Sequence, residues 1–461
     1  MNEVKKATGV VSPPAEPKSI DEAPMTRFLF KVSVFSSGGS FLDGYVLSLI
    51  GVALTQVTPM MRLSAMESGA IGASVMVGIL FGTILGGYLT DMIGRKKMFT
   101  IDVIAIALFS VLSMFTQGVW QLVLYRFCIG LFVGADYPIA TSLIAEFTPK
   151  AHRAISMGAV SAAWYLGATV AAFVGYALFP VEDGWRWMFG SAVIPCAILL
   201  VGRAGIPESP LWLAQKGRRA EAQAIVDGIY GPGYFIPHEE ETAKIPLGTL
   251  LKSGYFKRIA FIAVFIMCQV VPMYAIYTFG PDIMTAFGLG EGRASILGES
   301  LVSLFFLIGS FPAMFWLNSM GRRKLVLLSL TMMLVGLAVL GLWPAAPIAA
   351  VVVAFGLYAF FSGGPGILQW LYPNELFPTS VRASAVGIAI SFSRVFTIIA
   401  TYATPLVLAD FGIGVTMLIA AGLVAAGLVL SFLFAPETKG LSLVEASSLG
   451  TGADGRAPGG R

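Results

Sequence analysis

The segment YLTDMIGRKK at residues 88–97 returns as WLNSMGRRK at residues 316–324, which aligns Gly94 with Gly321. Two further pairs follow in the same order: EFTPKAHRA (146–154) with ELFPTSVRA (375–383), and PESPLWL (207–213) with PETKGLS (436–442). Three matches at offsets of 227 or 229 residues indicate an internal repeat, which has to be recognised before single elements are interpreted. The chain therefore consists of two similar halves.

The composition places both halves in a lipid bilayer. Hydrophobic residues make up 56% of the 461 residues, charged residues only 12%, and the mean hydropathy is +0.81. Because a soluble domain has about 25% charged residues, this chain has too few charges to cover a surface in water. The same figures exclude a disordered chain, a fibrous protein and a disulfide scaffold.

The sequence predicts no metal, no cofactor, no nucleic acid partner and no enzymatic activity. It has two histidines and three cysteines, and Cys128, Cys196 and Cys268 lie in apolar runs, where thiols act as small buried hydrophobes. It has no Gly-x-x-x-x-Gly-Lys-Ser/Thr phosphate loop. Energy for any transport must then come from an ion gradient or from the gradient of the substrate.

The apolar segments predict twelve transmembrane helices, since each crossing of a bilayer needs about 20 apolar residues. The expected spans are 28–57, 66–90, 98–117, 119–146, 153–179, 187–205, 257–286, 293–319, 324–343, 347–374, 382–409 and 412–435. The predicted fold is an all-α membrane protein with two pseudo-symmetric six-helix bundles. The expected domains are a tail (1–27), a bundle (28–205), a linker with amphipathic helices (206–256), a bundle (257–435) and a tail (436–461).

Basic residues orient the chain. With the N-terminus inside, 25 of the 30 Lys and Arg residues, Arg203 among them, are assigned to the cytoplasmic side and three to the outside. Loops rich in Lys and Arg stay in the cytoplasm, so both termini are expected there. The protein is expected to be a monomer in the cell (inner or plasma) membrane. Two arginines remain within the spans, Arg126 and Arg394.

Further motifs carry a family resemblance. GYLTDMIGRKK (87–97) and the Arg-x-x-x-Gly-x-x-x-Gly pattern of RFCIGLFVG (126–134) resemble signatures of the major facilitator superfamily. PESPLWL and PETKG resemble its sugar-porter and organic-ion-porter branches. FLDGYVL, GADYPIATS and FSGGPGILQWLYPNELFPT are similar to bacterial metabolite porters that lie between sugar, aromatic-acid and niacin porters. The resemblance covers residues 28–445, and parallel repeats of this kind place a substrate cavity between the halves.

Asp43 and Arg126 are the candidates for proton coupling. Ionisable side chains at membrane depth are costly and mark functional sites. Asp43 lies about 22 Å into the first span at ~1.5 Å per residue, and Arg126 lies in the fourth span. The two helices are neighbours in the superfamily, and the resemblance implies that this pair is the proton switch. The alternative is a static buried ion pair that fixes helix packing.

Arg394 is the candidate for contact with the substrate. It lies in the eleventh span, and the repeat aligns it with Tyr165 in the fifth, so the two are expected to face each other across the cavity. A guanidinium suits a carboxylate, and in the organic-ion carriers that this region resembles an arginine here accompanies anionic substrates. The alternative is pairing with an acid on another helix, such as Glu299 or Asp136.

Aromatic and amide side chains are predicted to complete the site, because small-molecule sites are mostly apolar with a few placed polar groups. The candidates are Trp164, Tyr165, Gln269, Tyr274, Tyr277, Tyr358, Phe361 and Gln369. For any single aromatic residue the alternative is core packing or lipid contact. The segment SGGPG (362–366) is interpreted as a hinge or gate, or else as a close approach of helices.

Charged residues near the cytoplasmic loops are predicted to form gates. They are Asp91, Gly94, Arg95, Glu146 and Arg153 in the first half, and Arg322, Glu375 and Arg382 in the second. In the family that the chain resembles, such residues tie helix ends together when the carrier faces outward. Asn318 stands where the first half has Asp91, which weakens the second gate. The alternative is that loop cations only set topology.

The predicted function is proton-coupled symport of a small organic acid, such as nicotinate or another aromatic or pyridine carboxylate, by alternating access. The alternative is a neutral sugar or polyol porter, a symporter or a facilitator, in which Arg394 is structural. The sugar-porter signatures favour this alternative, whereas the scarcity of Gln and Asn in the seventh and eighth spans opposes it. A third hypothesis is a transporter-like sensor without transport, which the short cytoplasmic tail disfavours.

Overall fold

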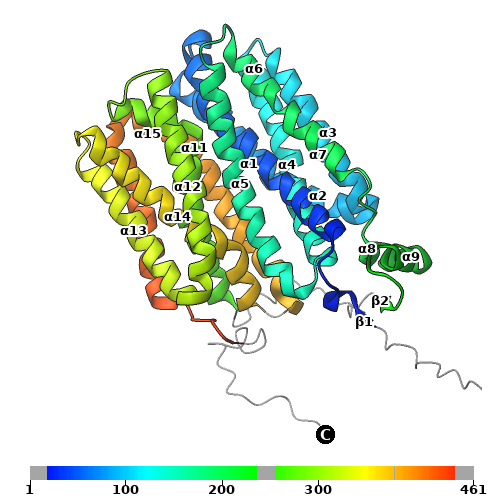
Figure 1. Ribbon diagram of the computed structural model, residues 1–461. Helices are drawn as coiled ribbons and strands as arrows, with labels where there is room; N and C mark the ends of the chain where they lie inside the picture. Colours follow the sequence, from blue (N-terminus) through cyan, green and yellow to red (C-terminus); the bar gives the residue numbers. More distant parts are fainter. Residues whose placement is uncertain (1–17, 236–254, 378, 442–461) are drawn as a thin grey trace, which may run out of the picture.

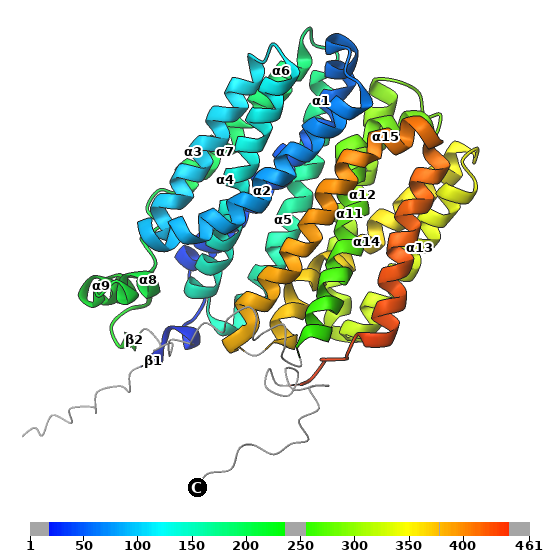
Figure 2. The ribbon, with the colours of Figure 1, turned by 180° about the vertical axis from the view of Figure 1, so that it is seen from behind.

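The chain folds into two helical bundles that lie side by side (Figures 1 and 2). The computed structural model describes residues 18–235, 255–377 and 379–441, almost all of them in α-helices. The predicted all-α membrane fold with two bundles is confirmed. Of the predicted tails and linker, residues 1–17, 236–254 and 442–461 lie outside the described residues.

The helices follow the predicted spans closely. The first bundle contains α1 (Arg27–Met61), α2 (Ala65–Ile93), α3 (Arg95–Met114), α4 (Val119–Phe147), α5 (Lys150–Leu178), α6 (Gly184–Ser191) and α7 (Val193–Arg203). The second contains α11 (Phe256–Ala286), α12 (Arg293–Met320), α13 (Arg322–Leu342), α14 (Ile348–Leu376) and α15 (Thr379–Phe434). The short elements are β1 (Lys18–Ser19), η1 (Ile20–Glu22), α8 (Pro210–Gln215), α9 (Arg219–Tyr230) and β2 (Tyr234–Phe235).

Twelve crossings arise from eleven apolar helical stretches in the described residues. Helices α6 and α7 form one continuous apolar stretch, Gly184–Arg203, and therefore one crossing. Helix α15 has 56 residues, about 84 Å at ~1.5 Å per residue, which is far longer than one crossing needs. It breaks at Gly412, whose φ of 77° and ψ of 176° lie outside the helical region. The break separates the eleventh crossing from the twelfth.

The bundles meet along pairs of helices that the repeat relates to each other. Helix α2 contacts α15, and α5 contacts α12. Since α2 and α12 are counterparts, as are α5 and the first part of α15, the two contacts are symmetric copies. Helices α1 and α11 meet so closely at Gly51 that a Cβ there would lie 2.6 Å from the carbonyl oxygen of Tyr277.

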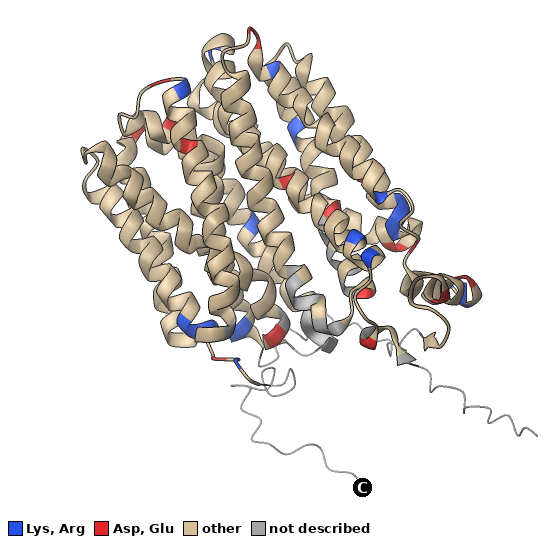
Figure 3. Ribbon diagram, in the orientation of Figure 1, with Lys and Arg blue, Asp and Glu red and all other residues tan. Residues whose placement is uncertain are grey.

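Charged residues gather at the two ends of the bundles and are few between them (Figure 3). We call the end that holds Arg95, Arg322 and the helices α8 and α9 the linker end. Helix α8 is anchored there, because the indole Nε1 of Trp212 donates to the carbonyl oxygen of Asp91 at 3.0 Å. The two short strands pair in parallel, with Lys18 opposite Tyr234.

The SGGPG segment stays helical inside α14, which runs without a break from Ile348 to Leu376. Its glycines allow close contact with other helices. A Cβ on Gly363 would lie 2.6 Å from the backbone of Gly309 on α12, and one on Gly366 would lie 2.5 Å from the Tyr165 hydroxyl on α5. This geometry favours the close-approach interpretation of the segment over the hinge.

The break in α15 gives a first testable prediction. Gly412→Ala should lower the free energy of unfolding by about 1 to 3 kcal/mol, because only glycine adopts its backbone angles without strain. Thermal unfolding of the detergent-purified protein measures the effect. Gly422→Ala is the matched control, since a Cβ there meets nothing within 4 Å and the position lacks a positive φ. Equal stability of the two variants would show that the break tolerates any residue.

Candidate functional site

A cavity between the bundles collects most of the predicted substrate residues. Helices α1 and α5 line it from one side, and α11, α14 and α15 line it from the other. The lining residues are Ser40, Val160, Ser161, Trp164, Tyr165, Val270, Met273, Tyr274, Gly366, Gln369, Trp370 and Arg394. We call it the central cavity. The predicted residues Trp164, Tyr165, Tyr274, Gln369 and Arg394 all belong to it.

Aromatic rings form one wall of the central cavity. Trp164 of α5 makes edge-to-face contacts with Tyr165 and Tyr274, with ring centroids 5.5 and 5.8 Å apart. The guanidinium carbon of Arg394 lies 5.4 Å from the centroid of the Tyr274 ring. The rings fix one another in place, so the cavity offers a preformed apolar face beside a cation.

Polar groups of both bundles also line the cavity. The side-chain amide of Gln369 donates to the carbonyl oxygen of Gly366 at 3.1 Å. The hydroxyl of Ser161 donates to the same carbonyl at 3.4 Å. Tyr165 donates to the sulfur of Met273 at 3.7 Å, a weak acceptor that a stronger one can replace. These groups suit a small polar solute.

Four predicted substrate residues lie outside the lining. Gln269 and Tyr358 are fully buried. Tyr277 packs its ring against Trp164 and Phe306, and Phe361 stacks on Trp316 at 6.1 Å. They support the wall of the cavity rather than its surface in this conformation. Met273 and Gly366, which do line it, carry no charge or amide that would distinguish them in the sequence.

Asp43 is joined to the central cavity by one side chain. Its carboxylate is 3% exposed, and its Oδ2 accepts a hydrogen bond of 2.7 Å from the indole Nε1 of Trp164. A hydrogen bond to a charged acceptor is about twice as strong as a neutral one. The ring that lines the cavity is therefore held by the acid on α1.

Arg126 of α4 binds the backbone of α1 three residues after Asp43. It is 1% exposed, and its Nη1 donates to the carbonyl oxygen of Val46 at 2.9 Å. In the described part of the chain no ion pair joins Arg126 to Asp43, and the Nε and Nη2 atoms of Arg126 make no hydrogen bond there. The coupling role of the pair stays a prediction.

Both acids that were considered as partners of Arg394 bind elsewhere. Asp136 forms an ion pair with Arg203, with 3.7 Å between Oδ1 and Nη2. Glu299 accepts a hydrogen bond of 2.8 Å from the hydroxyl of Ser303. Arg203, which the sequence analysis assigned to the cytoplasmic side, is 7% exposed, since its side chain turns inward from the last turn of α7 to meet Asp136.

At the linker end of the first bundle, the predicted gate residues Arg95 and Glu146 form an ion pair of 3.2 Å. Arg95 also lies 3.9 Å from the exposed carboxylate of Asp91. Glu208 accepts the backbone N–H of Lys96 at 3.1 Å, at the start of α3, where the helix dipole favours an anion. Gly94 has a φ of 106°, and a Cβ there would collide with this carboxylate.

The second bundle repeats the arrangement. Arg322 binds Glu375 through Nε at 3.2 Å and Nη2 at 2.7 Å. Glu437 takes the place of Glu208 at the start of α13, where it accepts the backbone N–H of Arg322 at 2.9 Å. Thr438 donates to Glu375 at 2.6 Å, as Ser209 donates to Glu146.

Backbone donors stabilise the charged form of Glu437. Burial by itself raises the pKa of this carboxyl, but the N–H groups of Lys439, Arg322, Arg323 and Thr438 outweigh burial and hold the pKa below its usual range. The sequence did not single out Glu208 and Glu437, although the paired motifs PES and PET mark them. The side chains of Arg153, Arg382 and Asn318 lie outside the described residues.

This charged cluster gives a second prediction. Glu375→Gln should lower the free energy of unfolding by roughly 2 kcal/mol, because the variant loses charge-assisted hydrogen bonds from Arg322. Thermal unfolding in detergent measures the loss. Glu291→Gln, at an exposed acid in the loop before α12, is the control and should change little. An equal effect of both variants would mean that the cluster does not hold the helix ends together.

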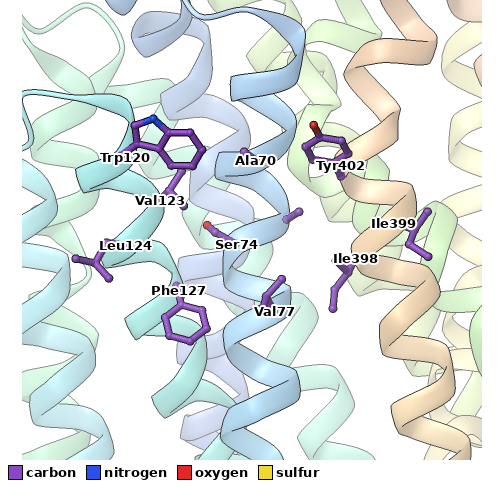
Figure 4. Close-up of a pocket in the computed structure, with 11 residues that line it drawn as sticks. Ala70, Ser74, Val77, Trp120, Val123, Leu124, Phe127, Ile398, Ile399 and Tyr402 are labelled. Atoms are coloured by element: carbon purple, nitrogen blue, oxygen red, sulfur yellow. The ribbon is translucent and has the colours of Figure 1, made fainter.

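A second, apolar hollow lies where α2 and α4 of the first bundle meet α15 of the second. Figure 4 shows its lining by side chains of α2, α4 and α15. Apart from Ser74, Trp120 and Tyr402, these side chains are hydrocarbon. A hydrophilic solute finds few partners there, whereas a lipid chain fits the chemistry. The central cavity is therefore the candidate substrate site.

Comparisons with known proteins agree with this architecture. Residues 31–449 match the family described as sugar (and other) transporter. The metabolite transport protein YaaU of Escherichia coli (strain K12) is 49% identical over 94% of this chain and 97% of its own. The arabinose-proton symporter of Bacillus subtilis (strain 168) is 28% identical over 92% and 97%. A partially occluded inward-open structure of the E. coli xylose transporter XylE aligns with a TM-score of 0.76 and 22% identity, over 90% of this chain and 100% of that one.

The chain belongs to the sugar (and other) transporter family, within the major facilitator fold. It is a multi-pass membrane transporter and not an enzyme. The predicted resemblance is confirmed. For the substrate, the comparisons favour the sugar or polyol alternative over the organic acid.

Proposed function

We propose that the protein is a proton-coupled symporter of a sugar or polyol in the inner membrane, and that its bundles alternate access to the central cavity. The observation that carries the proposal is a cavity lined by both bundles, in which Trp164 is hydrogen-bonded to the buried Asp43 at 2.7 Å. One side chain thereby connects a proton acceptor to a solute cavity.

The lining suits a sugar. Sugars present hydroxyl groups at their edges and C–H groups on their faces. Trp164, Trp370 and Tyr274 supply flat apolar surfaces, while Gln369 and Ser161 supply hydrogen-bonding groups. Relatives named for arabinose and xylose support this class of substrate.

Proton binding acts on the cavity through Trp164. A proton on Asp43 removes the charge that strengthens the hydrogen bond from the indole, so the ring is released to adjust to the solute. When the proton leaves, the carboxylate regains its charge and attracts Arg126, which lies near it on α4. The pair then holds the first bundle in the state that accepts the next proton.

The linker end faces the cytoplasm in this proposal, because it carries the basic residues of the loops. The clusters around Glu146 and Glu375 tie helix ends together within each bundle. Each bundle therefore moves as a unit when the carrier alternates between its two states.

A small organic acid, the first prediction from the sequence, is the second candidate. One observation favours it: Arg394 lines the central cavity. A guanidinium in a cavity of low polarity binds a carboxylate through two hydrogen bonds. In the sugar proposal the same group donates to hydroxyl groups instead.

A ligand panel separates the two candidates and is the third prediction. The panel compares D-xylose, L-arabinose, D-glucose and myo-inositol with the carboxylates nicotinate and D-gluconate. At least one sugar or polyol should raise the melting temperature of the purified protein. Arg394→Ala should weaken its binding about tenfold, the effect of ~1.4 kcal/mol. Arg293→Ala, outside the cavity, should leave binding unchanged. Stabilisation by the carboxylates alone would reject the sugar proposal in favour of the acid.

Removal of the proton acceptor is the fourth prediction. In proteoliposomes, Asp43→Asn should abolish accumulation of the labelled sugar that the panel identifies when a pH gradient is applied, because no group on α1 then carries the proton. Exchange of labelled for unlabelled sugar should persist. Asp410→Asn, at an exposed acid, is the control. Full proton-driven accumulation by Asp43→Asn would exclude Asp43 as the coupling group.

A further inference from the structure

Three charged side chains from three helices meet inside the first bundle, away from the central cavity. Asp102 belongs to α3, Asp136 to α4 and Arg203 to α7. Asp102 is 0% exposed, and the other two are each 7% exposed. Neither the substrate site nor the clusters at the linker end account for this group, which we call the inner cluster.

Arg203 holds the inner cluster together. Its Nη2 lies 3.7 Å from Oδ1 of Asp136, and its Nη1 donates to the carbonyl oxygen of Phe99 at 3.2 Å. Asp102 follows Phe99 by three residues on α3, so the two share a helix face. Asp102 interacts electrostatically with both Asp136 and Arg203.

The charges of the inner cluster do not balance. Two carboxylates share one guanidinium, and neither oxygen of Asp102 has a hydrogen-bond partner in the described part of the chain. In the described part of the chain, other titratable groups near Arg203 are the Cys196 thiol on α7, Lys96 at the start of α3, and Lys31 on α1, which donates to the carbonyl oxygen of Ala204. A bare buried carboxylate is disfavoured by several kcal/mol, whereas one bound proton makes the cluster neutral.

Cavities flank the inner cluster on both sides. A small one is lined by Asp43, Ser40 and Asp136, and therefore lies between the proton acceptor on α1 and the cluster. Gly39 also lines it, and a Cβ there would collide with the Asp136 carboxylate. A second cavity, at the linker end, is lined by Arg203, Lys96 and Thr100. The other lining residues of both cavities are mostly apolar, and the small cavity has a volume of about 10 Å³, which is room for about one water. The few polar groups in each wall can hold a water, and such a water passes protons.

We propose that Asp102 and Asp136, bridged by Arg203, form a second protonation site that carries the proton of Asp43 to the linker end through the first bundle, apart from the route of the solute. The proposal rests on the proton coupling proposed above.

The transfer conserves charge at each step. In the resting cluster Asp102 holds a proton, and Arg203 balances Asp136. The carboxyl of Asp43 gives its proton to water in the small cavity, and that water gives a proton to the Asp136 carboxylate. As this proton arrives, Asp102 gives its own proton to water at the linker end, and Arg203 then balances the Asp102 carboxylate. The proton on Asp136 passes to Asp102, which restores the resting cluster. One proton has entered and one has left, so the net charge of the cluster is unchanged over the cycle.

Infrared difference spectra of the purified protein, recorded during pH titration without any solute, test the second protonation site. The carboxylic acid C=O stretch should show a titrating band beyond that of Asp43, which Asp43→Asn identifies. Asp102→Asn and Asp136→Asn should each remove or shift the additional band, and Asp410→Asn should leave it in place. A wild-type spectrum with no such band, or a band that both cluster variants leave unchanged, would overturn the proposal.

The relaxation of the Asp43 band after a rapid pH jump tests the route. In Asp136→Asn the band should reach the same final amplitude but relax at least several-fold more slowly than in the wild type. An unchanged relaxation would reject the route through the cluster. Because no solute is present, these results are independent of the sugar panel and of proton-driven accumulation, so failure of the inner cluster is distinguishable from failure of the proposed function.

Discussion

The cost of placing a charge in hydrocarbon governs the structure of this protein. A lipid bilayer offers no water to a carboxylate or a guanidinium, so each charged side chain within the spans needs protein groups around it. Arg126 donates to a backbone carbonyl, and Asp43 accepts from an indole. Arg203 binds the Asp136 carboxylate and the carbonyl oxygens of Phe35 and Phe99. Each of these contacts joins two helices, so the rare charges also determine which helices pack together.

At the linker end, the repeated motifs likewise supply hydrogen-bond partners for charged groups, here at the helix termini. A glutamate from the PES or PET motif accepts backbone N–H groups at the start of α3 or α13, where the helix dipole is positive. The preceding glycine is required twice over, because its φ is positive and the carboxylate occupies the space of a Cβ. The two halves therefore preserve a backbone geometry as well as a set of charges.

The sequence predicted correctly those features that depend only on position along the chain. Hydropathy and the aligned glycines Gly94 and Gly321 were sufficient for the twelve spans and the two bundles, since both depend only on position along the chain. The direction in which a side chain points depends on packing. The sequence therefore did not predict that Gln269 and Tyr358 lie buried outside the lining of the central cavity, nor that Arg203 turns inward. Arg394 was found because it is an ionisable residue within a span, and the repeat then aligned it with Tyr165 in the fifth span.

The position of Trp164 has an evolutionary consequence. In the proposed function, Trp164 contacts both the proton acceptor and the solute cavity. Thermodynamic linkage then requires that the solute and the proton change each other's affinity by the same factor. Selection for a new solute that acts on this ring therefore also shifts the pH range in which the carrier works. Relatives that transport a different solute at the same pH are therefore expected to differ in the α14 or α15 side chains of the cavity and to keep the tryptophan.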